Sequence, residues 1–501
     1  MYIGVDCGTQ STKVVVLDPD RQILVGEGQA PHELISGADG QREQDPQVWI
    51  DALEQALATA LRRAGIDGRQ VRGIGISGQQ HGLVALDADG CPVYPAKLWN
   101  DTQAFRECAA LIEAMGGEAG CLARLGVVPQ PGYTAPKLAW LRAHHRAAYD
   151  RIATVLLPHD YLNFYLTGER VAECGDASGT AYFDTRTRCW DTKAFHHVAP
   201  ELDPERVLPR LIASDEPAGM LTPQMAARLG LAAGIPVSSG GGDNMMGAIG
   251  TGNLSPGAIT MSLGTSGTVY GCADAPVVAE PGLIANFCAS HGGWLPLICT
   301  MNVTSATRQV QTLLSLDLPG FTSAVAAAPP GAEGVQVLPF FDGERVPMLP
   351  EATASFIGLS AHNTTPANLC RAVMEGTTFG LRYGLDLLRA QGITPRDIRL
   401  VGGGANSAVW RQMVADVMNV PLVCVAGEAA ALGAALQAWW CDLTGRGDTT
   451  SLQTLCDQAV QVDESTRTRP DPARSQAYQG HYERYLTTLA AHYPHLSVAP
   501  R

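Results

Sequence analysis

The feature that most constrains the fold is a glycine–threonine turn that occurs twice, about half of the 501-residue chain apart. Near the N-terminus an apolar run leads to Gly8-Thr9, and a run of β-branched residues follows. An apolar run again leads to Gly264-Thr265, and a second short strand pattern leaves it. Such runs on both sides of a short turn are typical of β-hairpins. The pattern predicts two similar domains that each offer one hairpin to a shared ligand; the alternative is two unrelated hairpins that happen to share a Gly-Thr pair.

The residues after the first turn exclude two common nucleotide-binding motifs. In a P-loop or a Rossmann fingerprint, the glycine-rich turn opens a helix whose N-terminal amides hold the phosphate. Here Lys13 to Leu17 lack helical spacing and predict a strand, and Asp18-Pro19 indicates another turn. A tight hairpin can still bind phosphate, because consecutive backbone N–H groups form an anion-binding nest without a helix.

A third glycine cluster, Gly402-Gly403-Gly404, predicts a βαβ unit. A strand pattern precedes it, and Ser407 is placed to cap the helix that follows. Ligands bind α/β sheets at such strand ends, so we expect an adenosine to lie against this turn, which runs on through Ala405-Asn406. The alternative is a tight strand-to-helix connection with no ligand.

Residues 73–82 contain a sequence that matches a dinucleotide fingerprint only by its letters. Gly73-Ile74-Gly75-Ile76-Ser77-Gly78 has the spacing GxGxxG, but its isoleucines continue an apolar run, which predicts a strand. We therefore expect no dinucleotide site there. The polar stretch Gln79-Gln80-His81 that follows lies at the predicted strand end, between glycines, where a ligand could bind.

The fourth cluster places a carboxylate after three glycines, in Gly240-Gly241-Gly242-Asp243-Asn244. Asp243 could receive a proton from a substrate hydroxyl, since the glycines leave room for a bulky ligand. With an ordinary acidity it would be ionised at neutral pH without special tuning. The alternative is that Asp243 only caps the helix that follows.

Composition limits the class of protein. A formal charge of −14 argues against non-specific binding to nucleic acid or to an anionic membrane. No apolar run reaches transmembrane length and the N-terminus shows no signal-peptide pattern, so we expect a cytoplasmic protein. Its 13 cysteines lack zinc-site spacing and are expected to be free thiols, with a chemical role for Cys7 left open.

Together these clusters resemble the FGGY family of carbohydrate kinases, which share the nucleotide-binding architecture of actin and Hsp70. The resemblance covers nearly the whole chain. It includes two further signatures, Tyr133 to Leu141 and Phe356 to Gly376. Within the family, the stretches Glu43-Gln44-Asp45-Pro46 and Leu157 to Leu162 are similar to the bacterial branch that phosphorylates xylulose.

The resemblance implies an α/β fold of two actin-like (ribonuclease H-like) ATPase domains around a central nucleotide and substrate cleft. Residues 1–246 would form the mainly sugar-binding domain, with the first phosphate hairpin, and residues 247–501 the mainly ATP-binding domain. The implied reaction is ATP-dependent, Mg²⁺-assisted phosphorylation of the terminal hydroxyl of a ketopentose, with D-xylulose as the expected substrate. A homodimer is expected only by analogy with the family.

The resemblance also implies a role for each candidate residue. Asp243 would be the catalytic base, and Asp6 would act in catalysis by holding Mg²⁺, either directly or through water. The sugar would be bound by Gln80, His81, Asp101, Asp243 and Asn244. ATP would be bound by Gly8, Thr9, Gly264, Thr265, Gly402, Gly403, Gly404, Ala405 and Asn406.

One residue departs from the pattern of the xylulose-phosphorylating branch. That branch usually has an apolar Met where this chain has Gln80, and the new amide could bond to a sugar hydroxyl and change substrate preference. A kinase for D-ribulose, another ketose or a polyol therefore stays open. The alternatives from other classes are a non-metabolic actin-like ATPase and a sugar-responsive protein that has lost catalysis.

Overall fold

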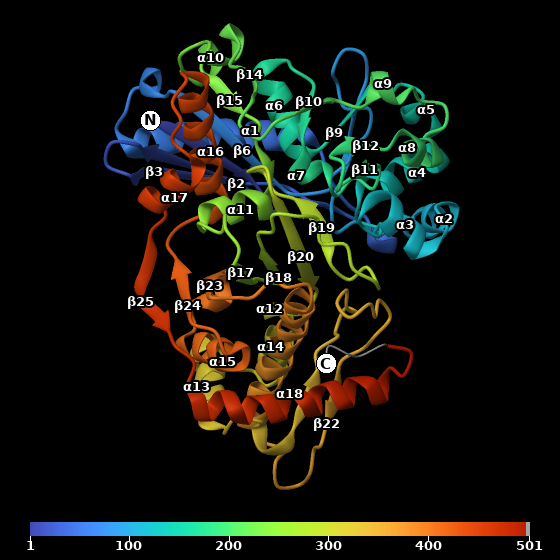
Figure 1. Ribbon diagram of the computed structural model, residues 1–501, viewed down its shortest axis with the longest axis vertical. Helices are drawn as coiled ribbons and strands as arrows, with labels where there is room; N and C mark the ends of the chain where they lie inside the picture. The colour runs from blue at the N-terminus through green and yellow to red at the C-terminus, as the bar shows by residue number, and fades with distance from the viewer. Residues whose placement is uncertain (497–501) are drawn as a thin grey trace. The chain divides into compact units, whose positions relative to one another are not determined.

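The computed structural model describes residues 1–496, which form two compact units (Figure 1). Unit 1 consists of Met1–Leu254, Ala273–Leu295 and Gly427–Val460, and unit 2 of the remaining segments from Ser255 onward. The predicted halves, 1–246 and 247–501, differ from these units because two later segments of the chain return to unit 1. The division of sugar and ATP binding between the predicted halves stays a prediction.

The main sheet of unit 1 has the strand order β14-β15-β6-β1-β2-β3, and β16 also pairs with β6. Its strands are β1 (Tyr2–Cys7), β2 (Ser11–Asp18), β3 (Ile23–Pro31), β6 (Gly73–Gly78), β14 (Pro217–Met220), β15 (Pro236–Ser238) and β16 (Gly241–Gly242). The short strands of unit 1 are β4 (Ile35–Ser36), β5 (Arg42–Gln44), β7 (Val84–Leu86), β8 (Ala96–Lys97), β9 (Thr154–Leu156), β10 (Val171–Glu173), β11 (Phe183–Asp184), β12 (Cys189–Trp190), β13 (Arg210–Ile212) and β19 (Ala285–Cys288).

In unit 2 the strand order runs β20-β18-β17-β23-β24-β25. These strands are β17 (Ala258–Leu263), β18 (Gly267–Gly271), β20 (Trp294–Thr300, paired with β18 through its last four residues), β23 (Asp397–Val401), β24 (Leu422–Val425) and β25 (Val462–Thr468). A separate two-stranded sheet joins β21 (Gln336–Leu338) and β22 (Ser355–Ile357).

The two main sheets share one topology. In each, a hairpin is antiparallel (β1–β2 or β17–β18), and the next strand runs parallel to the first strand of that hairpin (β6 or β23). A further parallel strand follows, and an antiparallel strand closes each sheet. The repeated Gly-Thr hairpin therefore occupies the same place in both sheets, which confirms the prediction of two similar α/β domains.

The helices are distributed between the units as follows. Unit 1 contains α1 (Pro46–Ala64), α2 (Phe105–Ala114), α3 (Gly117–Leu125), α4 (Thr134–His144), α5 (Arg146–Tyr149), α6 (Pro158–Thr167), α7 (Cys174–Ala177), α8 (Thr192–Val198), α9 (Pro204–Val207), α10 (Pro223–Leu229), α11 (Asp243–Gly250), α16 (Ala429–Gly445) and α17 (Leu452–Ala459). Unit 2 contains α12 (Thr304–Leu313), α13 (Leu318–Ala327), α14 (Pro366–Ala390), α15 (Ala408–Met418) and α18 (Pro472–His492). Among residues 1–496, none of these helices is long and apolar enough to cross a membrane.

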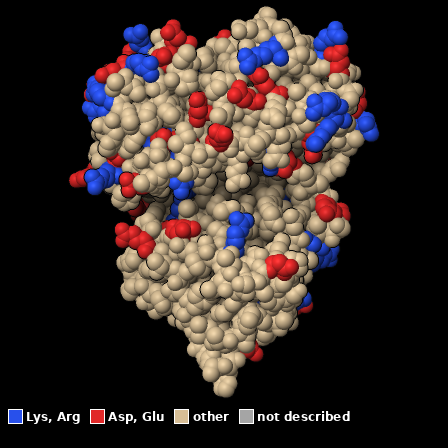
Figure 2. Space-filling model, turned by 180° about the vertical axis from the view of Figure 1, so that it is seen from behind, with Lys and Arg blue, Asp and Glu red and all other residues tan. Residues whose placement is uncertain are grey.

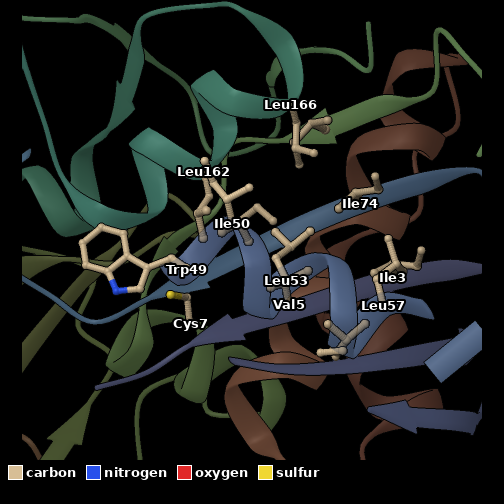
Figure 3. Packing of buried hydrophobic residues seen from close by; sticks show 14 of the residues in the cluster. Ile3, Val5, Cys7, Trp49, Ile50, Leu53, Leu57, Ile74, Leu162 and Leu166 are labelled. Carbon is tan, nitrogen blue, oxygen red and sulfur yellow. The ribbon is translucent and has the colours of Figure 1, made fainter. Parts of the chain in front are cut away.

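Helices cover both faces of the main sheet of unit 1. On one face, Ile3, Val5 and Cys7 of β1 pack with Trp49 and Leu53 of α1 in one buried cluster, which also contains residues of α6 (Figure 3). On the other face, Tyr2 of β1 and Val15 of β2 pack with residues of α16 in a second cluster. Alternate residues of a strand point to opposite faces, so a strand covered on both sides is apolar throughout.

Two glycines of this sheet let α16 approach the strands closely. A Cβ atom at Gly4 would lie 1.8 Å from the carbonyl oxygen of Ala431, and one at Gly75 would lie 2.0 Å from that of Ala434. The GxGxxG stretch forms strand β6, as predicted. At least one of its glycines, Gly75, is needed for the packing of α16 on the sheet.

Charged side chains of both signs are interspersed on the face drawn in Figure 2, and no continuous basic patch covers it. The face that Figure 2 shows is therefore mixed in charge, in a chain whose net charge is −14. Such a surface does not have the concentrated positive charge that draws nucleic acid to a protein.

Candidate active site

Three parallel strands of unit 1 end at one edge of the sheet and bring the candidate residues together. β1 and β16 both pair with β6 in parallel, and Gly242 lies opposite Gly78. Asp6 lies near the end of β1, Gln80 follows β6, and Asp243 follows β16. The carboxyl edge of an α/β sheet is where ligands bind.

Asp243 is the first residue of α11, and Gly242 is the N-cap. The alternative that Asp243 is the cap of this helix is therefore wrong. Its Oδ1 accepts two bonds from Asn244, from the backbone N–H at 2.8 Å and from Nδ2 at 3.0 Å. Both bonds use Oδ1, which leaves Oδ2 to accept a bond from another donor.

The acidity of Asp243 differs from the expectation of an ordinary carboxyl. Burial raises its pKa from 3.8 to about 7, and the negative charges of Asp6 and Asp176 add to the effect. The bonds from Asn244 lower the pKa but do not cancel the increase. The expectation that Asp243 needs no tuning is therefore wrong: its surroundings bring its pKa close to the pH at which a base acts best.

Asp6 is held by Ser77, whose Oγ donates to Asp6 Oδ1 at 2.8 Å. Burial raises the pKa of Asp6, while Ser77 and Lys13 act to lower it. Lys13 is itself paired with Glu428 at 2.6 Å. Carboxylate oxygens suit Mg²⁺, and a dication would relieve the repulsion between Asp6 and Asp243. Within residues 1–496, no group of three or more His, Cys, Asp or Glu side chains is arranged so that it could hold a metal ion. A magnesium ion at Asp6 would therefore take most of its ligands from water and phosphate.

Gln80 and His81 are fixed by close packing. Gln80 is 5% exposed, and its Oε1 accepts a 2.7 Å bond from Asn244 Nδ2. His81 has a φ of 66°, and its ring lies 4.6 Å from that of Tyr133. A Cβ atom at Gly179 would lie 1.9 Å from Nδ1 of His81. Gln80 and Asn244 thus lie beside Asp243, and His81 follows Gln80 directly.

The first Gly-Thr turn is fixed by side chains. Thr9 Oγ1 donates to Gln79 Oε1 and accepts from Trp99 Nε1, both at 3.0 Å. The backbone N–H of Gly8 donates across the turn to the carbonyl of Ser11 at 3.1 Å. Cys7, beside this turn, is buried, and burial raises its pKa to about 12. A thiol of that acidity stays protonated and unreactive at neutral pH.

In unit 2 the second Gly-Thr turn and the triple-glycine turn lie against each other. A Cβ atom at Gly402 would lie 2.9 Å from the backbone nitrogen of Gly264, and one at Gly404 would lie 2.8 Å from Cβ of Leu263. A Cβ atom at Gly403 would meet nothing within 4 Å. Two of the three glycines therefore serve the packing of this turn, and Gly403 has open space for a ligand.

The remaining predicted ATP-binding residues lie beside these turns. Thr265 is exposed, and its carbonyl accepts from the backbone N–H of Val303 at 3.1 Å, just before α12. Ala405 and Asn406 complete the short 3₁₀ helix Gly403–Asn406. Ser407 then caps α15 by accepting from the N–H of Trp410, as predicted.

Asp101 is not brought into contact with Asp243 or Gln80. It is fully buried, forms an ion pair with Lys97 at 3.0 Å, and accepts backbone N–H bonds from Arg42 and Gln103. These contacts hold β5 and β8 to the loop that follows β8. A role for Asp101 at the sugar stays a prediction without support from its contacts.

A buried group of charged residues that was not among the predicted site residues lies next to Gln80. His159 is fully buried, with Nδ1 2.9 Å from Asp176 Oδ2 and Nε2 3.0 Å from Asp160 Oδ1. Burial opposes its protonation, but the two carboxylates outweigh burial and raise its pKa well above the ordinary value. Nearby Glu173 caps α7, and burial raises its pKa to about 7. Of these residues, His159 and Asp160 belong to a stretch that carries the resemblance, Leu157 to Leu162.

The fold and the site define a class. Two sheets of one topology, each with a Gly-Thr hairpin at the same place, and a carboxylate beside polar side chains are the parts of an actin-like phosphotransferase. Two family models match the chain, the FGGY family of carbohydrate kinases, N-terminal domain, over residues 1–250 and the C-terminal domain of the same family over residues 259–441. The chain belongs to the FGGY family of carbohydrate kinases.

Individual relatives agree with the family. A xylulose kinase from Haemophilus influenzae is 50% identical over 498 residues, which are 98% of this chain and 100% of that protein. A xylulose kinase from Streptomyces rubiginosus is 41% identical over 87% of both chains. A crystal structure described as a xyloylose kinase from Brucella ovis has a TM-score of 0.91 at 30% identity and covers 98% of this chain and 99% of its own. The non-metabolic ATPase alternative is thereby excluded.

Proposed function

We propose that this chain transfers the γ-phosphoryl group of ATP to the terminal hydroxyl of D-xylulose and so forms D-xylulose 5-phosphate. The observation that carries the proposal is Asp243, a carboxylate with Oδ2 free of its two bonds to Asn244 and a pKa raised by burial to about 7. The identity of 50% with a xylulose kinase over nearly the whole chain supports the choice of sugar.

In this mechanism Asp243 Oδ2 accepts the proton of the sugar hydroxyl while the hydroxyl oxygen bonds to the γ-phosphorus. The bond from that phosphorus to the leaving oxygen breaks, and ADP departs. The protein mainly positions the reactants and neutralises charge, as phosphoryl transfer requires. Asn244, Gln80 and His81 hold the sugar in our proposal.

The nucleotide is assigned to residues of both units. The backbone amides at Gly8-Thr9 and Gly264-Thr265 would bind its phosphates. The turn from Gly402 to Asn406 would lie against the adenosine, where Gly403 leaves open space. Asp6 would hold Mg²⁺, which when bound supplies positive charge to the phosphates.

Gln80 supports a second candidate substrate, D-ribulose or a polyol. An amide in place of the usual apolar residue can bond to a hydroxyl that D-xylulose presents differently from D-ribulose or a polyol.

The cytoplasmic location and the homodimer stay predictions, and sedimentation of the purified protein would test the dimer.

The test is a coupled ADP-release assay with D-xylulose, D-ribulose, other ketoses and polyols at saturating ATP and Mg²⁺. We expect the highest kcat/KM for D-xylulose. A higher value for D-ribulose or a polyol would reject the choice of sugar. In that case Gln80→Met should move the preference toward D-xylulose if the Gln80 amide causes the change. An unchanged preference would exclude the amide as the cause.

A further inference from the structure

Two carboxylates and two amides form a chain of polar groups that ends at the candidate base. Asn244 Nδ2 donates to both Asp243 Oδ1, at 3.0 Å, and Gln80 Oε1, at 2.7 Å. On the other side, Asp176 Oδ2 is held 2.9 Å from His159 Nδ1. Asp176 and His159 are fully buried, and Gln80 is 5% exposed.

The link between Asp176 and Gln80 rests on two matching atoms. Asp176 Oδ1 and Gln80 Nε2 are both buried, and neither has a hydrogen-bond partner of normal geometry among residues 1–496. One is an acceptor and the other a donor. The Gln80 amide lies close enough to help lower the pKa of Asp176 against the larger effect of burial, which raises it. β16, whose Gly242 lies against Gln80, also packs on α7, the helix that contains Asp176.

The order of donors and acceptors permits one orientation of each amide. An ionised carboxylate only accepts hydrogen bonds, whereas an amide has a donating and an accepting end. A flipped Gln80 would turn its carbonyl toward Asp176 and its NH₂ group toward that of Asn244, so both contacts would be repulsive. With Gln80 fixed, the NH₂ group of Asn244 points to Gln80 and Asp243, and its Oδ1 is left to accept from a substrate.

We propose that Asp176 is a positioning residue that acts through Gln80 to fix the Asn244 amide, so that Asn244 presents its carbonyl oxygen to a hydroxyl of the sugar. The proposal rests on the proposed function, because it assigns the presented oxygen to the sugar of that reaction. It gives Gln80 a role between side chains in addition to the contact with the sugar proposed above, and it connects His159 and Asp176 to the active site.

The test is a double-mutant cycle that reverses the polarity of one link. In Asp176→Asn, His159 Nδ1–H still donates to the carbonyl oxygen of the new asparagine, so the NH₂ group of that asparagine faces Gln80. This arrangement favours rotation of the Gln80 amide by about 180°. In Gln80→Glu, two carboxylates face each other. Each single variant should raise KM for the sugar about tenfold, the value of about one lost hydrogen bond, with KM for ATP unchanged.

The double variant restores the order of donors and acceptors. The new asparagine donates to the new glutamate, and that glutamate also accepts from Asn244, as the carbonyl of Gln80 does in the wild type. KM for the sugar should therefore return to within about threefold of the wild-type value. Losses that simply add in the double variant, in proteins that melt cooperatively, would overturn the proposal.

Control measurements separate positioning from folding. Asp160→Asn is the matched control, since Asp160 contacts the other nitrogen of His159 and should change Tm while KM for the sugar stays constant. The wild-type rate on D-xylulose tests the proposed function separately, and if another ketose or polyol is preferred, the cycle is measured on that substrate.

Discussion

At the scale of single residues, Asp243 can be tested for catalysis without disturbing the start of α11. Gly242 is the cap, so Asp243→Asn removes no capping bond, and asparagine keeps the size of the side chain. Loss of a positioned base typically costs about 10²- to 10⁴-fold in rate. We expect kcat to fall by that order while KM for ATP stays near the wild-type value. Both quantities are measured in the coupled ADP-release assay. Near-normal turnover by the folded variant would reject Asp243 as the base.

The same substitution should stabilise the protein at alkaline pH. The folded pKa of Asp243, about 7, lies above the ordinary 3.8, so its protonation contributes stability below 3.8 that is lost as the pH rises through 7. Above pH 7 the wild type carries a poorly solvated negative charge that Asp6 and Asp176 repel, whereas asparagine is neutral. Without magnesium, Asp243→Asn should raise Tm by about 2 °C at pH 8 and less at pH 5. An equal shift at both values would contradict the raised pKa.

The sequence predicted where Asp243 lies but not how acidic it is. Three glycines before a carboxylate marked the position. The pKa depends on burial and on Asp6 and Asp176, which are distant in sequence and meet Asp243 only in the folded sheet. The pairing of His159 with Asp176 was not predictable for a similar reason, since the two residues are 17 positions apart and meet only in the folded chain.

At the scale of elements, the triple-glycine turn separates packing from ligand binding. Gly403→Ala adds a methyl group that meets no protein atom within 4 Å, so the free energy of unfolding should stay constant. If adenosine lies there, KM for ATP should rise about tenfold, the effect of about 1.4 kcal/mol. The measurements are urea unfolding and the coupled assay.

The matched control is Gly404→Ala in the same turn. Its Cβ would lie 2.8 Å from Cβ of Leu263, so we expect the variant to lose about 1–3 kcal/mol of stability through overpacking. An unchanged KM for ATP in Gly403→Ala would place the adenosine elsewhere.

Local elements were predictable because their signals are local. The hairpins, the strand in place of a fingerprint, and the βαβ unit with its Ser407 cap all follow from neighbouring residues. The covering of β1 and β6 by α16 was not predictable, because nothing near Gly4 or Gly75 indicates which helix will approach them. The predicted domain boundary near residue 247 placed α16 in the C-terminal domain, whereas α16 belongs to unit 1.

At the scale of the whole molecule, the proposed nucleotide-binding residues are divided between two units. Productive binding would need both units to engage one ATP, and closure would keep water from competing with the sugar. We expect the radius of gyration from X-ray scattering to decrease with D-xylulose and a non-hydrolysable ATP analogue together. Either ligand alone should cause a smaller decrease. An unchanged radius with both ligands at saturation would contradict closure.

The return of residues 427–460 to unit 1 has a consequence for synthesis on the ribosome. The nascent chain makes β1 and β6 early, but α16, which covers one face of them, emerges roughly 350 residues later, about 20–70 s at ordinary rates of translation. Until then the face around Tyr2 and Val15 has no cover from α16. The N-terminal unit therefore cannot finish folding during its own translation, and a fragment that ends before Gly427 should need a chaperone to stay in solution.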